Sequence, residues 1–179
     1  MDYYKQKQII ACVDADDTVQ KRVEKWGAHK KGILHRGFTV ILKYKDSYLL
    51  QHRKHPVFDG YFDLSYSSHP VYINNKLQDD LSAIYESLKR EWNIEKKGLA
   101  GKPLSRGKFI YKASDKSGGY TEHEVDHIYL VEIKKLPEIN LDFAYGYSLL
   151  KKHELQDIKN QTERKLAPWV KEIITRGFL

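Results

Sequence analysis

Three histidines and two glutamates have the residue types and the spacing that a metal site needs. His29, His35 and His69 each lie beside or within a predicted turn or strand start, and Glu122 and Glu124 are two positions apart. Because side chains two apart in a strand point to the same face, both carboxylates would project together. Imidazole and carboxylate groups suit a divalent ion such as Mn²⁺, Zn²⁺ or Mg²⁺. The spacing alone favours a plainer interpretation, namely surface histidines and a solvated edge strand whose charges deter pairing.

The segments that would carry these residues include several strands, which alternating apolar residues predict. They are residues 9–13, 38–42, 48–52, 108–113, 125–133 and 142–147, and the stretch that begins at Val19. Polar turns at residues 14–18, 45–47 and 114–119 would join successive strands into hairpins.

Two helices are predicted beside these strands. Residues 76–92 repeat apolar side chains at three- and four-residue spacing, which predicts an amphipathic helix lying on the sheet. The stripe consists of Leu77, Leu81, Ile84, Tyr85, Leu88 and Trp92. Pro168 can occupy the first position of a last helix that turns Trp169 inward and ends at Gly177. Strands and helices mixed without regular βαβ alternation predict an α+β fold, in which helices sandwich a mixed sheet.

Length and composition limit the protein class. The 179 residues, 41% of them hydrophobic, suffice for one well-buried core, so we expect a single domain over residues 1–179. No apolar run approaches the roughly 20 residues that span a bilayer, and the N-terminus lacks the apolar stretch of a signal peptide. The single cysteine, Cys12, agrees with a reducing compartment, so we expect a cytoplasmic protein.

The net charge of +7 indicates anionic partners, for which both nucleic acid and phosphorylated metabolites qualify. Lysines and arginines are scattered among acidic residues, as is typical of a solvated surface. We therefore expect a small-molecule partner rather than nucleic acid, and a monomer or weak homodimer.

Several separated motifs, taken together, resemble the type I isopentenyl-diphosphate isomerases of the Nudix superfamily in order and separation. They are VDADDTVQKRVEKWGAH at 13–29, LHRGFTVIL at 34–42, DLSYSSHP at 63–70, FIYKASDKSGGYTEHEV at 109–125 and APWV at 167–170. The resemblance spans nearly the whole chain. It implies a Nudix fold, a small diphosphate substrate and a divalent metal.

The resemblance also implies a set of binding residues. The family's metal ligands, three histidines and two glutamates, match His29, His35, His69, Glu122 and Glu124. Glu91 matches the carboxylate that helps hold Mg²⁺ against the diphosphate, and Mg²⁺ typically needs few protein carboxylates. Lys25 and Arg53 match positions that hold diphosphate oxygens, where a fixed cation and a bidentate guanidinium make physical sense.

The residues that would transfer protons match the family only in part. Glu124 matches its catalytic glutamate and Tyr111 the tyrosine beside it, but Ser67 stands at the position of its catalytic cysteine. A serine hydroxyl is a far weaker acid than a thiol of pKa ~8.5 and needs a neighbouring base. Trp169 matches the aromatic ring that shields a carbocation. We expect impaired or altered proton transfer.

Two further departures concern the diphosphate. The loop between Arg53 and Gly60 is shorter than usual for the family and contains Pro56, and Ser87 stands where the family has an arginine. Both changes predict looser binding or a different preferred substrate.

Three functions follow, of which isomerisation of isopentenyl diphosphate is the leading hypothesis. The alternative, Nudix diphosphate hydrolysis, needs several glutamates on one helix to hold Mg²⁺. In the register of the isomerases Glu91 is the last of them and Asn93 replaces a glycine, whereas a shifted register leaves Ser82 and Ile94 at acidic positions. A non-catalytic diphosphate sensor or nucleic-acid binder is the third, and the latter would show a contiguous basic face that this sequence lacks.

Overall fold

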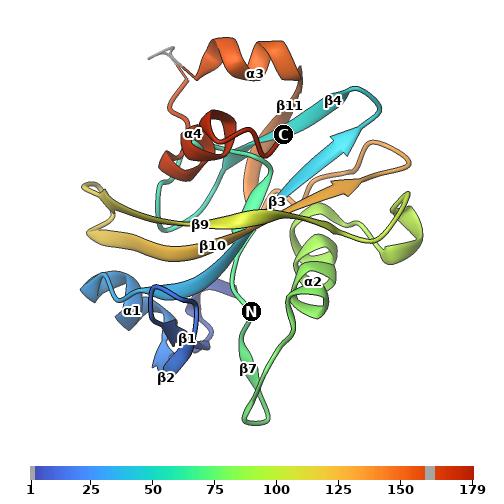
Figure 1. Ribbon diagram of the computed structural model, residues 1–179. Helices are drawn as coiled ribbons and strands as arrows, with labels where there is room; N and C mark the ends of the chain where they lie inside the picture. Colours follow the sequence, from blue (N-terminus) through green and yellow to red (C-terminus); the bar gives the residue numbers. More distant parts are fainter. Residues whose placement is uncertain (1–2, 160–163) are drawn as a thin grey trace.

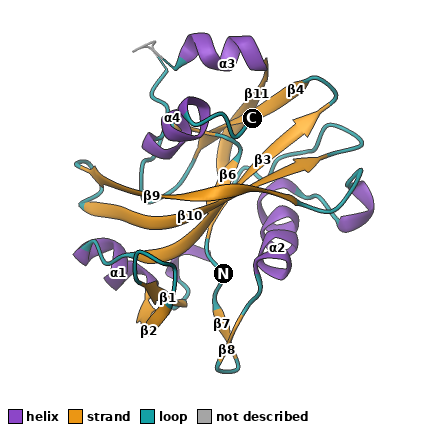
Figure 2. Ribbon diagram, in the orientation of Figure 1, coloured by secondary structure: helices purple, strands orange, loops and turns teal. Residues whose placement is uncertain are grey.

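A large mixed sheet with helices on both faces forms the centre of the computed structural model, which describes residues 3–159 and 164–179 (Figures 1 and 2). Its strands are β1 (Ile9–Val13), β2 (Val19–Glu24), β3 (His35–Tyr44), β4 (Ser47–Arg53), β5 (Phe62–Asp63), β6 (Tyr66–Ser68), β9 (Leu104–Asp115), β10 (Tyr120–Glu132) and β11 (Ala144–Lys151). A separate small hairpin pairs β7 (Tyr72–Ile73) with β8 (Lys76–Leu77). The helices are α1 (Lys25–Lys31), α2 (Asp80–Trp92), α3 (Lys152–Ile158) and α4 (Pro168–Thr175), with 3-10 turns η1 (Tyr3–Lys5) and η2 (Lys96–Gly98).

Strand β3 is the hub of the sheet. It pairs antiparallel with β1, β4 and β6 and parallel with β10, whose other edge pairs antiparallel with β9. In the parallel register Glu124 lies opposite His35 and Asp126 opposite Gly37. The pairing therefore brings together two motifs that are far apart in the sequence.

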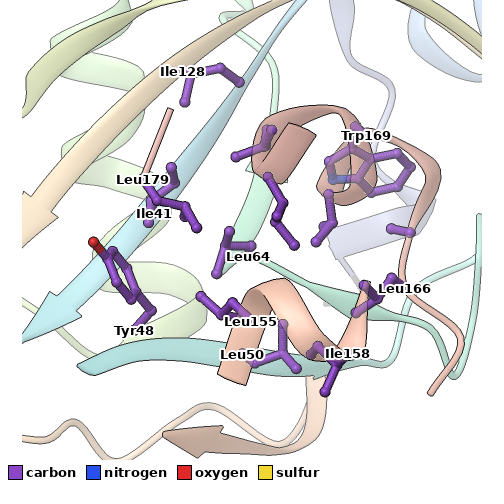
Figure 3. Packing of buried hydrophobic residues seen from close by; sticks show 14 of the residues in the cluster. Ile41, Tyr48, Leu50, Leu64, Ile128, Leu155, Ile158, Leu166, Trp169 and Leu179 are labelled. Carbon is purple, nitrogen blue, oxygen red and sulfur yellow. The ribbon is translucent and has the colours of Figure 1, made fainter. Parts of the chain in front are cut away.

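Alternating side chains of β3 build a core on each face of the sheet. Val40 and Leu42 pack with Ile84, Leu88 and Trp92 of α2. On the opposite face, Ile41 belongs to a cluster with residues of α3 and α4, and Figure 3 shows Leu64, Leu155 and Trp169 in the same cluster. The period of two residues on β3 thus serves two helical layers. The predicted α+β fold, a mixed sheet between helices, is confirmed.

The predicted hairpins are confirmed, with longer strands in the third, because β9 and β10 extend to residues 104–115 and 120–132. The last helix is also confirmed, with Trp169 buried. The predicted strand at 142–147 is shifted, since β11 runs from Ala144 to Lys151.

The predicted start of the helix over residues 76–92 is wrong. Asn74 and Asn75, with φ of 47° and 65°, turn the chain between β7 and β8. The helix begins only after Asp79, whose carboxylate accepts a hydrogen bond from Ser82 N at 2.9 Å. Leu77 consequently lies in a strand, and Leu81 is exposed rather than packed on the sheet.

Helices α1 and α3 were not among the predicted elements. Each has only seven residues, and α1 contains Gly27, so neither shows an extended apolar repeat. Among the described residues, none of the helices has the length and apolar character needed to cross a membrane.

Candidate metal centre

The two glutamates of the candidate centre lie inside strand β10. Glu122 and Glu124 are 5% and 4% exposed; β9 pairs with β10 at both positions, and β3 pairs with its other edge from Glu124 onward. Their spacing of two places both carboxylates on one face of the strand. The solvated-edge interpretation is therefore wrong.

Three histidines reach these carboxylates from different elements. His29 lies in α1, which Glu24 caps by accepting hydrogen bonds from the backbone, and His35 is the first residue of β3. His69 directly follows β6. The imidazole ring centroids are 4.7–5.2 Å apart. One ligand atom from each of the five predicted residues lies within 4.8 Å of the others, so the fold brings the whole predicted set together.

The tautomers of His29 and His35 are fixed by backbone carbonyls. His29 Nδ1 is 2.7 Å from Lys25 O, and His35 Nδ1 is 2.7 Å from Ile33 O. A carbonyl only accepts hydrogen bonds, so each Nδ1 carries a hydrogen and Nε2 is the nitrogen turned towards the cluster, where it offers a lone pair whenever the ring is neutral. This is the arrangement that orients histidines bound to a metal.

Unpaired lone pairs in the cluster also fit a cation. His29 Nε2 and Glu122 Oε2 are buried and 3.2 Å apart, yet neither forms a hydrogen bond with any residue that the structure describes. Burying two such acceptors without a partner is costly. The donor set of imidazole nitrogens and carboxylate oxygens therefore fits a divalent ion.

Glu124 contacts two histidines and a tyrosine of the centre. Its Oε1 is 2.8 Å from His69 Nε2, and its Oε2 accepts a hydrogen bond of 2.7 Å from the Tyr111 hydroxyl. Burial acts to raise the pKa of Glu124, but the hydrogen bonds with His35 and His69 hold it well below its usual range. Burial and the charge of Glu124 raise the pKa of Tyr111, which therefore stays a neutral donor.

Gly37 makes room for this carboxylate, and sequence reasoning did not single it out. A Cβ atom at Gly37 would lie 2.5 Å from Glu124 Oε1. Gly37 acquires this role through the parallel pairing of β3 with β10, a register that is not visible in the sequence.

A small cavity lies between the metal ligands and the remaining predicted site residues. Its volume is about 20 Å³, and its walls include Lys25, Arg53, Ser67, Tyr111 and Trp169 together with His55, His69, Glu122 and Glu124. This is room for about one water molecule. A substrate would have to displace part of this wall.

Buried Asp63 contacts three of the side chains that line the small cavity. Trp169 Nε1 donates to its Oδ1 at 2.8 Å, the Arg53 guanidinium pairs with its Oδ2, and Ser67 Oγ lies 3.2 Å from the same Oδ2. Ser67 Oγ is also 2.9 Å from Thr39 Oγ1. The weakly acidic serine thus has a carboxylate neighbour.

Comparisons with known proteins agree with this site. No family model matches the chain. It is 32% identical to the isopentenyl-diphosphate Delta-isomerase 1 of Mus musculus over 83% of its own length and 70% of that protein. The chain belongs to the isopentenyl-diphosphate isomerase family. It is also 29% identical to isopentenyl-diphosphate delta-isomerase 2 of Homo sapiens, over 95% of this chain and 82% of the relative.

Solved structures identify the fold of this isomerase-family chain. DR0079 from Deinococcus radiodurans has a TM-score of 0.67 at 16% identity, covering 94% of this chain and 98% of its own. A MutT NUDIX hydrolase from Burkholderia pseudomallei has a TM-score of 0.54 at 15% identity, over 79% and 96% of the two chains. The predicted Nudix fold is confirmed.

Two positions of the family resemblance lie on α2, of which Ser87 is a departure and Glu91 a match. Ser87 is buried, and its hydroxyl contacts Ala83 O at 2.8 Å and the Tyr66 hydroxyl at 3.1 Å. Glu91 lies outside the five-residue cluster and accepts a hydrogen bond of 2.7 Å from Arg90 Nη2. It still acts on the site, because its charge helps to raise the pKa of Lys25 against the lowering effect of burial.

Proposed function

We propose that this protein interconverts isopentenyl diphosphate and dimethylallyl diphosphate. One observation carries the proposal: Glu124, fixed by two histidines and Tyr111, borders the same cavity as Ser67 and Trp169. Membership of the isopentenyl-diphosphate isomerase family supports it.

The reaction moves a double bond by one position. One proton is added to the terminal carbon of the alkene and another is lost from the allylic carbon next to the diphosphate-bearing carbon, so composition and charge do not change. Glu124 is the principal acid and base in this scheme, and Tyr111 keeps its carboxylate oriented. The Trp169 ring would stabilise positive charge that develops on the substrate.

Ser67 is the weaker partner in this transfer. A hydroxyl transfers a proton poorly unless a base assists, and the nearest carboxylate is that of Asp63, already paired with Arg53. We therefore expect slow turnover, with Ser67 or a water molecule held by it exchanging the second proton.

Lys25, Arg53 and Glu91 are assigned to the diphosphate. The two cations would bind its oxygens, and Glu91 would hold Mg²⁺ that is shared with it. The five clustered ligands, Glu124 among them, would hold Mn²⁺ or Zn²⁺.

The test is an assay of the purified protein with isopentenyl diphosphate, Mg²⁺ and either Mn²⁺ or Zn²⁺. Dimethylallyl diphosphate and released phosphate are followed together. We expect the allylic product to disappear in Glu124→Gln and to form faster in Ser67→Cys. Glu132→Gln is the control, since Glu132 is exposed on the same strand.

Other outcomes would reject isomerisation. Phosphate release without the allylic product would support diphosphate hydrolysis, which the Nudix fold alone permits. Helix α2 argues against it, since Glu86 and Glu91 are its only glutamates, and Glu86 is exposed and bonded to Gln78. No product of either kind would support a non-catalytic diphosphate-binding protein.

A further inference from the structure

A second, much larger cavity adjoins the metal centre and is used by none of the roles assigned so far. Its volume is about 1110 Å³, and it meets the small cavity at His55, which lines both. Tyr3, Tyr4, Phe143 and Arg90 form part of its wall. The cavity is thus an approach to the metal centre that has an aromatic wall and a guanidinium group.

Arg90 lies in this wall with one donor unused. Its Nη2 donates to Glu91 Oε1 at 2.7 Å and to Ser68 Oγ at 3.3 Å, and its guanidinium carbon is 4.1 Å from the centre of the Tyr3 ring. Its Nε is buried and donates to no acceptor within residues 3–159 and 164–179. A buried guanidinium donor without an acceptor is costly, so this geometry suits an anion that takes the Nε–H.

Two other cations, Lys25 and Arg53, line the adjoining small cavity. Arg53 Nε is also buried and without an acceptor in the described parts of the chain. Lys25 Nζ and the Arg90 guanidinium carbon lie 5.5 and 4.1 Å from the centre of the same Tyr3 ring, so the two cations are neighbours. Three neighbouring cations, two of which have a buried Nε–H without an acceptor among the described residues, fit an anion that carries several charges.

The position of Ser87 explains why Arg90 is needed. Ser87 carries no charge, and its hydroxyl is already hydrogen-bonded within its own helix and to Tyr66. It therefore cannot take the place of an arginine that binds an anion. Arg90 follows three residues later, and residues three apart are neighbours on a helix surface.

We infer that Arg90 binds the diphosphate of the substrate from the larger cavity and takes the part of the arginine that Ser87 replaces. This inference rests on the proposed function, which names a diphosphate as the anion. It adds a binding residue that the family resemblance does not supply.

The experiment compares Arg90→Gln and Arg90→Lys with Lys89→Gln, a change of the exposed cation next to it on α2. The kinetic constants for isopentenyl diphosphate are measured together with the affinity for inorganic diphosphate in the presence of Mg²⁺. We expect Arg90→Gln to raise KM and weaken diphosphate binding about 10-fold to 100-fold, as loss of a charge-assisted hydrogen bond does. The value of kcat should change less than about threefold, and Lys89→Gln should behave like the wild type.

Arg90→Lys tests the guanidinium itself. It keeps the charge beside Glu91 but lacks the Nε–H in the same position, so we expect only partial recovery of binding. Full recovery, or an unchanged KM and diphosphate affinity in a folded Arg90→Gln, would overturn the inference.

Binding of inorganic diphosphate separates this inference from the proposed function. If the wild type does not isomerise but binds diphosphate in a way that depends on Arg90, the proposed function fails and the inference stands. If the wild type isomerises normally and Arg90→Gln does too, only the inference fails. If the wild type neither isomerises nor binds diphosphate, both fail.

Discussion

Burial of Lys25 weakens the fold, and its proposed role is to bind the diphosphate, so replacing it should have opposite effects on stability and on binding. Its side chain is buried at 4% exposure beside the metal ligands. Burial, followed by repulsion from Arg90, lowers its pKa from 10.5 to about 8. We expect Lys25→Met to stabilise the metal-free protein and to weaken its affinity for diphosphate.

The size of the stabilisation follows from the pKa shift. The difference between 10.5 and about 8 is about 2.5 pH units, and at about 1.4 kcal/mol per unit this is about 3 kcal/mol. The cation–π contact of Lys25 Nζ with Trp26, at 4.7 Å, opposes this by about 1 kcal/mol. Lys25→Met should therefore raise the free energy of unfolding at pH 7 by about 2 kcal/mol.

The sign of the pH dependence is specific to a buried lysine. Below pH 8 the side chain is charged in both states, so the full cost of burial is present in the folded wild type. Between pH 8 and 10.5 the folded state loses this proton while the unfolded state keeps it, so the wild type gains stability as the pH rises. The advantage of Lys25→Met should shrink over this window and vanish above it.

Urea unfolding of EDTA-treated protein at pH 7 and pH 10 measures both effects. Lys30→Met is the control, because Lys30 is exposed on the same helix and should change the stability by less than about 0.5 kcal/mol. If Lys25→Met were no more stable than the wild type at pH 7, or if its advantage did not depend on pH, Lys25 would not carry a desolvation cost and the reasoning would be wrong.

Two further substitutions test the packing of the site. Gly37→Ala should displace Glu124, whose Oε1 lies 2.5 Å from the new Cβ position, so we expect loss of isomerase activity and a free energy of unfolding lower by about 1–3 kcal/mol. Gly101→Ala is the control, because its Cβ meets no atom within 4 Å and should leave activity intact. An active Gly37→Ala would contradict the assigned position of Glu124. Asp63→Asn leaves the buried Arg53 without its counter-charge, so urea unfolding should show a free energy of unfolding lower by about 3–5 kcal/mol. A loss below about 1 kcal/mol would instead mean that water solvates this pair.

The local elements of the fold were predictable where the sequence carries its own periodicity. Alternation around residues 38–42 predicts β3, and the same alternation feeds both cores because Ile41 faces one way and Val40 the other. Leu77 fits the apolar spacing of α2 by coincidence, although it lies in β8, so the spacing predicted a start that is too early. Two stronger signals mark the true start of the helix. Asn74 and Asn75 form a turn before it, and Asp79 caps its first turn.

The assembly of the site was predictable only through resemblance to a family. Spacing places Glu122 and Glu124 on one face, but nothing local indicates that β10 runs parallel to β3 and sets Glu124 beside His35. Partners that depend on this packing, such as Gly37 and Arg90, were accordingly missed. Long-range register is set by packing of the whole sheet, which a single sequence does not display.

Asp63 couples the parts of the site that a family comparison treats separately. Its two oxygens contact Trp169, Arg53 and Ser67, so a change at Ser67 also alters the surroundings of the Arg53 guanidinium. A thiol is a weak hydrogen-bond donor. We therefore expect Ser67→Cys to turn over faster and yet to be less stable to urea by about 1–2 kcal/mol, because a hydrogen bond to a buried carboxylate is lost. Unchanged stability would mean that the serine hydroxyl donates to Thr39 rather than to Asp63.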